Sequence, residues 1–129
     1  MAEAYPVYVI DDEQFVRDWA ELMCEDLGFS CRTFSGGKAF LDAYYTLAPG
    51  CILLDMRMPK PNGLAVQAEL AARGGLMPVI AMTGYGDVDV AVQSMRLGAI
   101  EFLEKPFTQE VLKEAIEKGL RQLRQSQES

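Results

Sequence analysis

Short apolar runs alternate with amphipathic stretches along the chain. Residues 7–10, 51–54 and 79–82 are continuous hydrophobic runs, which are typical of strands buried on both faces of a parallel sheet. Residues 29–34 are more polar and predict an edge strand, and residues 100–103 predict a fifth strand. A stretch with helical spacing follows each strand, so the pattern predicts five strands alternating with five helices.

The amphipathic stretches carry hydrophobic residues three and four positions apart, as helices with one buried face do. The first helix is expected between Asp12 and Gly28, and two more follow the second and third strands. The fourth is expected to start at Asp87 and the last at Thr108, because both residue types are good helix caps. The last helix is expected to run to about residue 123.

This alternation predicts an α/β domain, a doubly wound five-stranded parallel sheet with right-handed crossovers. We expect the flavodoxin-like strand order 2-1-3-4-5, in which the first and third strands are neighbours and ligands bind beyond their carboxyl ends. A chain of 129 residues fits one domain, to which we assign residues 1–123. Residues 124–129 are interpreted as a frayed end or the start of a linker, with any output domain lying outside this chain.

The chain is acidic, with a net charge of −7. Because nucleic-acid backbones attract basic surfaces, we expect no direct binding of DNA by this chain. No apolar run approaches the roughly 20 residues of a membrane span, and residues 1–5 do not resemble the start of a signal peptide. We therefore expect no membrane association and a cytoplasmic location, in which the three cysteines are reduced.

Polar side chains follow four of the predicted strands, at the point where each strand ends. They are Asp11 and Asp12 after the first strand, Asp55 after the third, Thr83 after the fourth and Lys105 after the fifth. Adjacent strands lie about 4.8 Å apart, so in the expected order these side chains converge on one cleft. Taken singly, each has an ordinary interpretation as a helix cap, a turn residue or a loop residue. Their occurrence together after four strands favours a functional site.

Three carboxylates in one cleft repel each other, and a hard divalent cation relieves that repulsion. Magnesium takes oxygen ligands from carboxylates, waters and phosphates, so the cluster predicts an Mg2+ site. Lys105 adds a fixed positive charge, and Thr83 adds a hydroxyl donor for anionic oxygens. The set suits phosphoryl transfer, in which a carboxylate can act as the nucleophile and form an aspartyl phosphate.

Four motifs carry a family resemblance. They are Asp-Asp-Glu at 11–13, Asp-Met-Arg-Met-Pro at 55–59, Met-Thr-Gly at 82–84 and Lys-Pro-Phe at 105–107. Together they cover nearly the whole chain and resemble the receiver domain family of two-component response regulators. Residues 53–59, 83–88 and 102–107 are especially similar to the FixJ-like group, whose members usually carry a C-terminal helix-turn-helix domain.

The resemblance implies a role for each site residue. Asp55 would accept a phosphoryl group from a sensor histidine kinase, and Lys105 would contact that group. Mg2+ would be held by Asp11 or Asp12, by Asp55 and by the backbone carbonyl of Arg57. The resemblance also implies a cis peptide bond between Lys105 and Pro106. The chain contains no histidine, so the phosphodonor must come from outside.

Thr83 and Phe102 occupy the positions of the family's two switch residues. By the resemblance, Thr83 moves toward the phosphoryl group and Phe102 swings inward. Phe102 lacks the hydroxyl of a tyrosine, so it would report by burial alone. The fourth helix, fifth strand and fifth helix would then form the output face that controls transcription, and phosphorylation is expected to promote a homodimer there.

The spacing in the fourth helix predicts which residues this face exposes. A core stripe is expected at Val88, Ala91, Val92 and Met95. Val90 and Leu97, seven positions apart, would then lie together on a second, exposed side. We also expect the bulky side chains of Arg57 and Tyr85 to crowd an attacking water and to slow hydrolysis of the aspartyl phosphate.

Three alternatives differ from a transcriptional receiver. A receiver without an output domain would act by protein–protein contact alone. A metal-dependent phosphatase that forms an aspartyl phosphate would place Asp-x-Asp after the first strand, which residues 11–14 do not supply. A flavodoxin-type flavin module would need a Gly-rich phosphate loop there, where this chain has acids that repel phosphate. The chain departs from the commonest receiver pattern at Lys60-Pro61, which stiffens the loop beside Asp55 and leaves partner specificity open.

Overall fold

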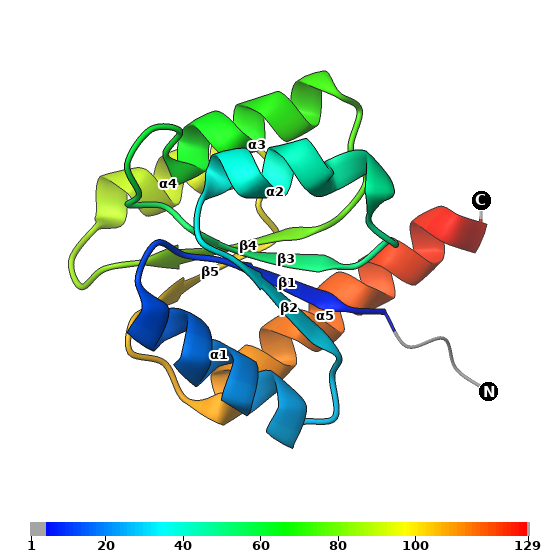
Figure 1. Cartoon of the computed structure of the whole chain (residues 1–129), viewed down its shortest axis with the longest axis horizontal. Coiled ribbons are helices and arrows are strands. Elements are labelled where there is room, and N and C mark those ends of the chain that lie inside the picture. The colour runs from blue at the N-terminus through cyan, green and yellow to red at the C-terminus, as the bar shows by residue number, and fades with distance from the viewer. Residues whose placement is uncertain (1–4, 129) are drawn as a thin grey trace.

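The computed structural model describes residues 5–128, and its centre is one parallel sheet (Figure 1). The strand order is β2-β1-β3-β4-β5, and every neighbouring pair is parallel. The fold class and the strand order predicted from the sequence are therefore confirmed. The strands are β1 Val7–Ile10, β2 Cys31–Phe34, β3 Cys51–Asp55, β4 Val79–Thr83 and β5 Glu101–Glu104.

Helices cover both faces of the sheet, with α1 and α5 on one side and α2, α3 and α4 on the other (Figure 1). A short 3-10 helix, Tyr44–Thr46, continues α2. This double cover explains why the central strands are hydrophobic up to their last residues, since both of their faces are buried. The helices are α1 Gln14–Asp26, α2 Gly37–Ala43, α3 Gly63–Ala72, α4 Val88–Arg96 and α5 Gln109–Glu128.

Two hydrophobic cores form because successive strand residues face opposite sides of the sheet. Val9 and Leu53 pack toward the side of α1 and α5, whereas Ile10 and Leu54 pack toward α2 and α3. Register pairs Ile10 with Leu54, so β1 and β3 end level with each other. The residues that follow these two strands are thereby brought to one edge of the sheet.

The predicted end of the last helix near residue 123 was wrong. Helix α5 continues to Glu128, and Leu123 is a buried core residue within it. No glycine or proline follows to stop the helix, and the polar residues that do follow are mostly good helix formers. The assignment of residues 124–129 to a linker stays a prediction.

The predicted absence of a signal peptide concerns residues 1–5, of which 1–4 lie outside the described residues.

The predicted faces of α4 were only partly right, because Ala91 is buried and Leu97 is exposed as expected, but the other positions are not as predicted. Val88, Val92 and Met95 are exposed on this helix, whereas Val90 packs against the core beneath α3 and α4. The buried positions belong to Ala91 and to a polar residue, Ser94. Hydrophobic spacing alone could not identify this face, because the buried side of α4 is made of small residues.

Ser94 is accommodated because Gln67 of α3 satisfies its hydrogen bonds. The Ser94 hydroxyl donates to Gln67 Oε1 at 2.8 Å, and Gln67 Nε2 donates to the Ser94 carbonyl oxygen at 3.1 Å. A buried polar pair is tolerated when its groups bond each other, and this pair holds α4 against α3. The apolar stripe of α4 is left facing outward as a result.

The cysteines were expected to be reduced, and no helix was expected to cross a membrane. Cys24 and Cys51 are buried, Cys31 is half-buried, and all three are free thiols, as expected. Burial raises the pKa of Cys51 to about 12, so this thiol is inert in the core. Over residues 5–128, none of the helices combines the length and the apolar character needed to cross a membrane.

Candidate functional site

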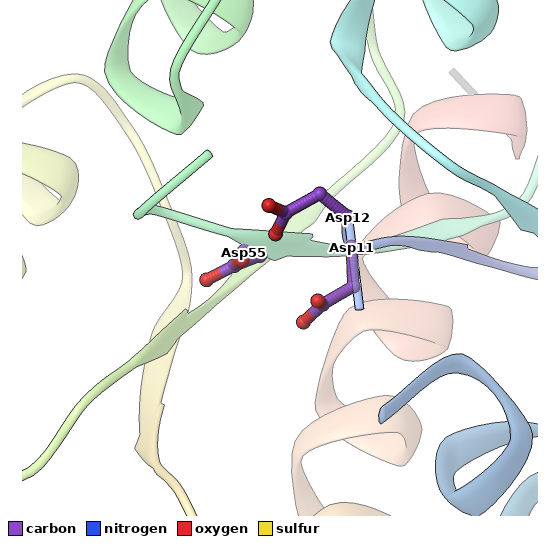
Figure 2. Close-up of side chains that lie close together, drawn as sticks. All are labelled: Asp11, Asp12 and Asp55. Atoms are coloured by element: carbon purple, nitrogen blue, oxygen red, sulfur yellow. The ribbon is translucent and has the colours of Figure 1, made fainter. Parts of the chain in front are cut away.

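Three carboxylates lie together at the carboxyl ends of β1 and β3 (Figure 2). Asp55 is the last residue of β3, and Asp11 and Asp12 follow β1 directly. One oxygen from each residue lies within 4.8 Å of the others, and Figure 2 shows all three carboxylates directed to the same side. Asp11 and Asp55 are buried, whereas Asp12 is exposed. The predicted acidic cluster therefore exists, with two of its members inside the protein and one at the surface.

Lys105, which directly follows the edge strand β5, completes the cluster. Its Nζ lies 2.9 Å from Asp11 Oδ2 and 3.3 Å from Asp55 Oδ1. The Lys105 amide donates to the Thr83 carbonyl oxygen at 2.8 Å, which keeps this residue in line with β4. The Lys105–Pro106 bond is cis, as predicted, and Lys60–Pro61 is a second cis bond that the sequence did not predict.

Backbone contacts hold the acidic residues in place. Asp11 Oδ1 accepts a hydrogen bond from the Glu13 amide at 2.9 Å, and Asp55 Oδ1 accepts one from the Arg57 amide at 3.2 Å. Gly63 lies so close to Asp55 that a Cβ there would be 2.6 Å from the Asp55 carbonyl oxygen. Gly63 is thus a structural part of the site, and in the sequence it precedes the third predicted helix and belongs to the receiver pattern together with residues 55–59.

The electrostatics of the cluster favour a bound cation. Burial, together with the negative charge of Asp11, raises the pKa of Asp55 to about 6, although Lys105 and the Arg57 amide oppose this. Burial alone would lower the pKa of Lys105, but its contacts with Asp11 and Asp55 outweigh burial and raise it. One lysine does not neutralise three carboxylates. An all-oxygen donor set with excess negative charge fits a hard divalent ion such as Mg2+.

The two predicted switch residues lie beside one groove between α4 and β5. Thr83 is buried, and its hydroxyl makes only a long hydrogen bond, 3.5 Å, to the Leu103 carbonyl oxygen. Phe102 is 44% exposed. The groove has a volume of about 370 Å³, and its apolar lining consists of Val88, Ala91, Val92, Met95 and Phe102. The groove offers Phe102 a space to enter if it turns inward.

The side chains of Arg57 and Asp87 form an ion pair that the sequence did not reveal. Arg57 Nε lies 2.7 Å from Asp87 Oδ2, and Arg57 Nη2 lies 2.8 Å from Asp87 Oδ1. Asp87 occupies the N-cap position of α4, as predicted, but its side chain makes no capping hydrogen bond. Tyr85 is 91% exposed. Slow hydrolysis through crowding by Arg57 and Tyr85 stays a prediction.

A doubly wound sheet with an acidic cluster, a lysine and a threonine at the ends of four adjoining strands defines a phosphoacceptor receiver module. The chain belongs to the response regulator receiver domain family, whose model matches residues 7–117. This family works in two-component signalling, in which a histidine kinase is the partner, and its members are signalling domains rather than classical enzymes.

Several relatives place the chain more narrowly. It is 46% identical to the transcriptional regulatory protein FixJ of Azorhizobium caulinodans over 120 residues, which cover 93% of this chain and 57% of that protein. The crystal structure of full-length FixJ from B. japonicum matches with a TM-score of 0.89 and 39% identity, covering 95% of this chain and 60% of that one. The structure of FixJ-N matches with a TM-score of 0.88 and 36% identity, covering 92% of this chain and 94% of that one.

These matches confirm the similarity to the FixJ-like group. The chain spans little more than half the length of the curated relatives it matches. Two of these relatives are named transcriptional regulatory proteins, and the third is named a response regulator protein.

Proposed function

We propose that this chain is a phosphorelay receiver that accepts a phosphoryl group from a sensor histidine kinase onto Asp55. The observation that carries the proposal is the setting of the Asp55 carboxylate. It is 2% exposed, at the end of a central strand, and has an ammonium group 3.3 Å away and two further carboxylates beside it. A carboxylate in this setting is positioned as a nucleophile and has a fixed positive charge beside it for the incoming phosphoryl oxygens.

Mg2+ is the cofactor of this proposal, held by Asp11, Asp12, Asp55 and the backbone carbonyl of Arg57. When bound, the ion neutralises charge on the cluster and on the phosphoryl oxygens. The pKa of Asp55 near 6 means that the carboxylate already predominates at neutral pH, so the nucleophile is available.

The transfer is an in-line displacement. An oxygen of the Asp55 carboxylate attacks the phosphorus, the bond from phosphorus to the donor breaks, and the donor leaves with the electron pair of that bond. Lys105 is already oriented by Asp11 and can pair with the phosphoryl oxygens as charge builds on them. The product is an acyl phosphate on Asp55, which water hydrolyses slowly.

The phosphoryl group would pull the Thr83 hydroxyl away from its long bond to Leu103, and Phe102 would enter the groove beside α4. This change would alter the face formed by α4, β5 and α5 and promote a homodimer. The surface for that dimer would consist of Val88, Val92 and Met95, because Val90 is partly buried against the core. Transcription control by an output domain is part of the proposal, as is a cytoplasmic location.

Two observations weigh against other functions. The nucleophile candidate follows β3 rather than β1, which disfavours the phosphatase alternative. The net charge of −7 disfavours direct contact between this chain and DNA, so an output domain would make that contact. A receiver that acts by protein–protein contact alone uses the same switch and stays the alternative.

Incubation with acetyl phosphate and Mg2+, followed by intact-mass measurement, tests the proposal. We expect one added phosphoryl group on the wild-type chain and none on Asp55→Asn or after chelation of the metal. Asp42→Asn, a surface aspartate on α2, is the matched control and should be modified like the wild type. Equal modification of the Asp55→Asn variant would show that the acceptor is another residue.

A further inference from the structure

The Arg57–Asp87 ion pair joins two loops on the surface beside the phosphoacceptor. The residues are 30 positions apart in sequence, and both guanidinium contacts are short, at 2.7 and 2.8 Å. The other ion pairs of the described residues are local, join α5 to β5, or belong to the Lys105 cluster. A two-point contact between a guanidinium and a carboxylate has a fixed geometry, so this pair sets the relative position of the two loops.

On one side, the pair is connected to the phosphoacceptor. Arg57 lies two residues after Asp55, and its amide donates to Asp55 Oδ1 at 3.2 Å. The same residue thus contacts the acceptor through its main chain and Asp87 through its side chain. A change at Asp55 therefore acts directly on a residue that holds α4.

On the other side, the pair is connected to α4. The Ala91 amide donates to the Asp87 carbonyl oxygen at 3.2 Å, so Asp87 is continuous with the first turn of the helix. Because the Asp87 side chain makes no cap for α4, its carboxylate is free to serve Arg57 alone.

Side-chain contacts hold the loop between β4 and α4 at the end that joins α4. Arg57 binds Asp87, and the Gly86 amide donates to Glu104 Oε2 at 3.0 Å. At the other end, the Thr83 carbonyl oxygen is fixed by the Lys105 amide at 2.8 Å, but the Thr83 hydroxyl makes only a 3.5 Å contact. The Thr83 side chain is therefore held more weakly than the residues at the start of α4.

We propose that the Arg57–Asp87 ion pair is a latch that holds α4 and its preceding loop in the resting position, and that phosphorylation of Asp55 opens it. This inference rests on the proposed function. A phosphoryl group adds a charge of about −1.5 to −2 two residues from Arg57, together with oxygens that a guanidinium binds in the same two-point way. The phosphoryl oxygens compete with the Asp87 carboxylate for the Arg57 guanidinium. When they displace it, the ion pair breaks, and the start of α4 can move together with Thr83. Arg57 and Asp87 are therefore positioning residues of the switch.

Titration of the chain with beryllium fluoride in the presence of Mg2+, followed by calorimetry, tests the latch with a phosphoryl mimic. Asp87→Ala should bind the mimic roughly two- to fivefold more tightly than the wild type, the range expected for loss of an exposed ion pair. The gain should shrink in high salt, which screens the pair. Asp89→Ala removes the same charge two residues away, from an exposed position in the first turn of α4, and should bind like the wild type.

A second pair of variants separates the latch from a general loosening of the loop. In an Arg57→Ala background, the further change Asp87→Ala should have no effect, because the partner of Asp87 is already gone. An equal gain from Asp87→Ala in both backgrounds, or no gain in the wild type, would overturn the latch. Failure of the wild-type chain to bind the mimic at all would instead overturn the proposed function, so the two failures are distinguishable.

Discussion

Replacing Asp55 with asparagine should stabilise the metal-free protein. Asparagine has nearly the shape of a protonated aspartate and carries no charge. The pKa of Asp55 is about 6 in the folded protein, against an ordinary value of 3.8. A carboxyl group with a raised folded pKa binds its proton more tightly in the native state than in the unfolded chain. Stability is therefore lost as the pH rises through the window from about 3.8 to 6, and the loss is complete at pH 7.

The magnitude follows from the size of the shift. The difference between 6 and 3.8 is 2.2 pKa units, and each unit corresponds to about 1.4 kcal/mol, so the ionised Asp55 costs about 3 kcal/mol at neutral pH. The pKa of about 6 already includes the stabilising effect of Lys105 on the Asp55 carboxylate, so the loss of that contact adds no separate cost. In the variant, Lys105 still pairs with Asp11, 2.9 Å away. We expect a gain of about 2 to 3 kcal/mol in the free energy of unfolding, or roughly 6 to 10 °C in melting temperature.

Urea unfolding in the presence of a chelator, at pH 7.5 and at pH 4, measures this gain. The advantage of Asp55→Asn should be full at pH 7.5 and small at pH 4, where Asp55 of the folded wild-type protein is protonated. Addition of Mg2+ should narrow the gap at pH 7.5 by stabilising the wild type more than the variant. Asp42→Asn is the control for loss of an exposed carboxylate and should change stability little. An advantage of the same size at both pH values would refute the electrostatic reasoning.

Three further predictions concern the metal, the dimer surface and the packing of the site. Mg2+ affinity measured by calorimetry should fall as the pH drops below about 6, because protonation of Asp55 removes the negative charge of a ligand. An affinity that stays constant from pH 7.5 to 5 would contradict this. Val88→Glu and Val92→Glu should each weaken the dimer formed with beryllium fluoride in sedimentation experiments. Phe15→Glu, at a more exposed apolar position on α1, should leave it intact. Gly63→Ala should destabilise the fold by about 2 to 4 kcal/mol in urea unfolding, because its Cβ would meet the Asp55 carbonyl oxygen; an unchanged midpoint would show that the loop can move away.

The strands and most of the site were predictable because their signals are local. A strand buried on both faces must be hydrophobic at every position, so the runs at 7–10, 51–54 and 79–82 are visible without any neighbour. A polar residue directly after such a run lies at the carboxyl edge of the sheet, whichever helix covers it. Asp55 was found in this way, and Lys105 was found because it follows the fifth predicted strand; the structure brings their charged atoms to 3.3 Å.

The orientation of α4 was not predictable in the same way. The sequence of α4 contains two apolar faces. Which of them is buried depends on the side chains of the neighbouring elements that the helix packs against. Gln67, 27 residues earlier, provides a partner for Ser94, and this long-range hydrogen bond makes burial of a serine acceptable. No local pattern contains that information, so the spacing rule placed Val88 inside and Val90 outside, the reverse of the structure.

What the sequence by itself determined is the set of elements, their order in the sheet and the meeting of Asp11, Asp55, Thr83 and Lys105 at its edge. These follow from periodicity, from chain connectivity and from the handedness of crossovers, all of which act along the chain. Only the tertiary structure decided which side chains pair across loops, as Arg57 does with Asp87, and which side of α4 meets solvent. Those choices depend on distances between segments far apart in sequence, and such distances exist only once the layers have packed.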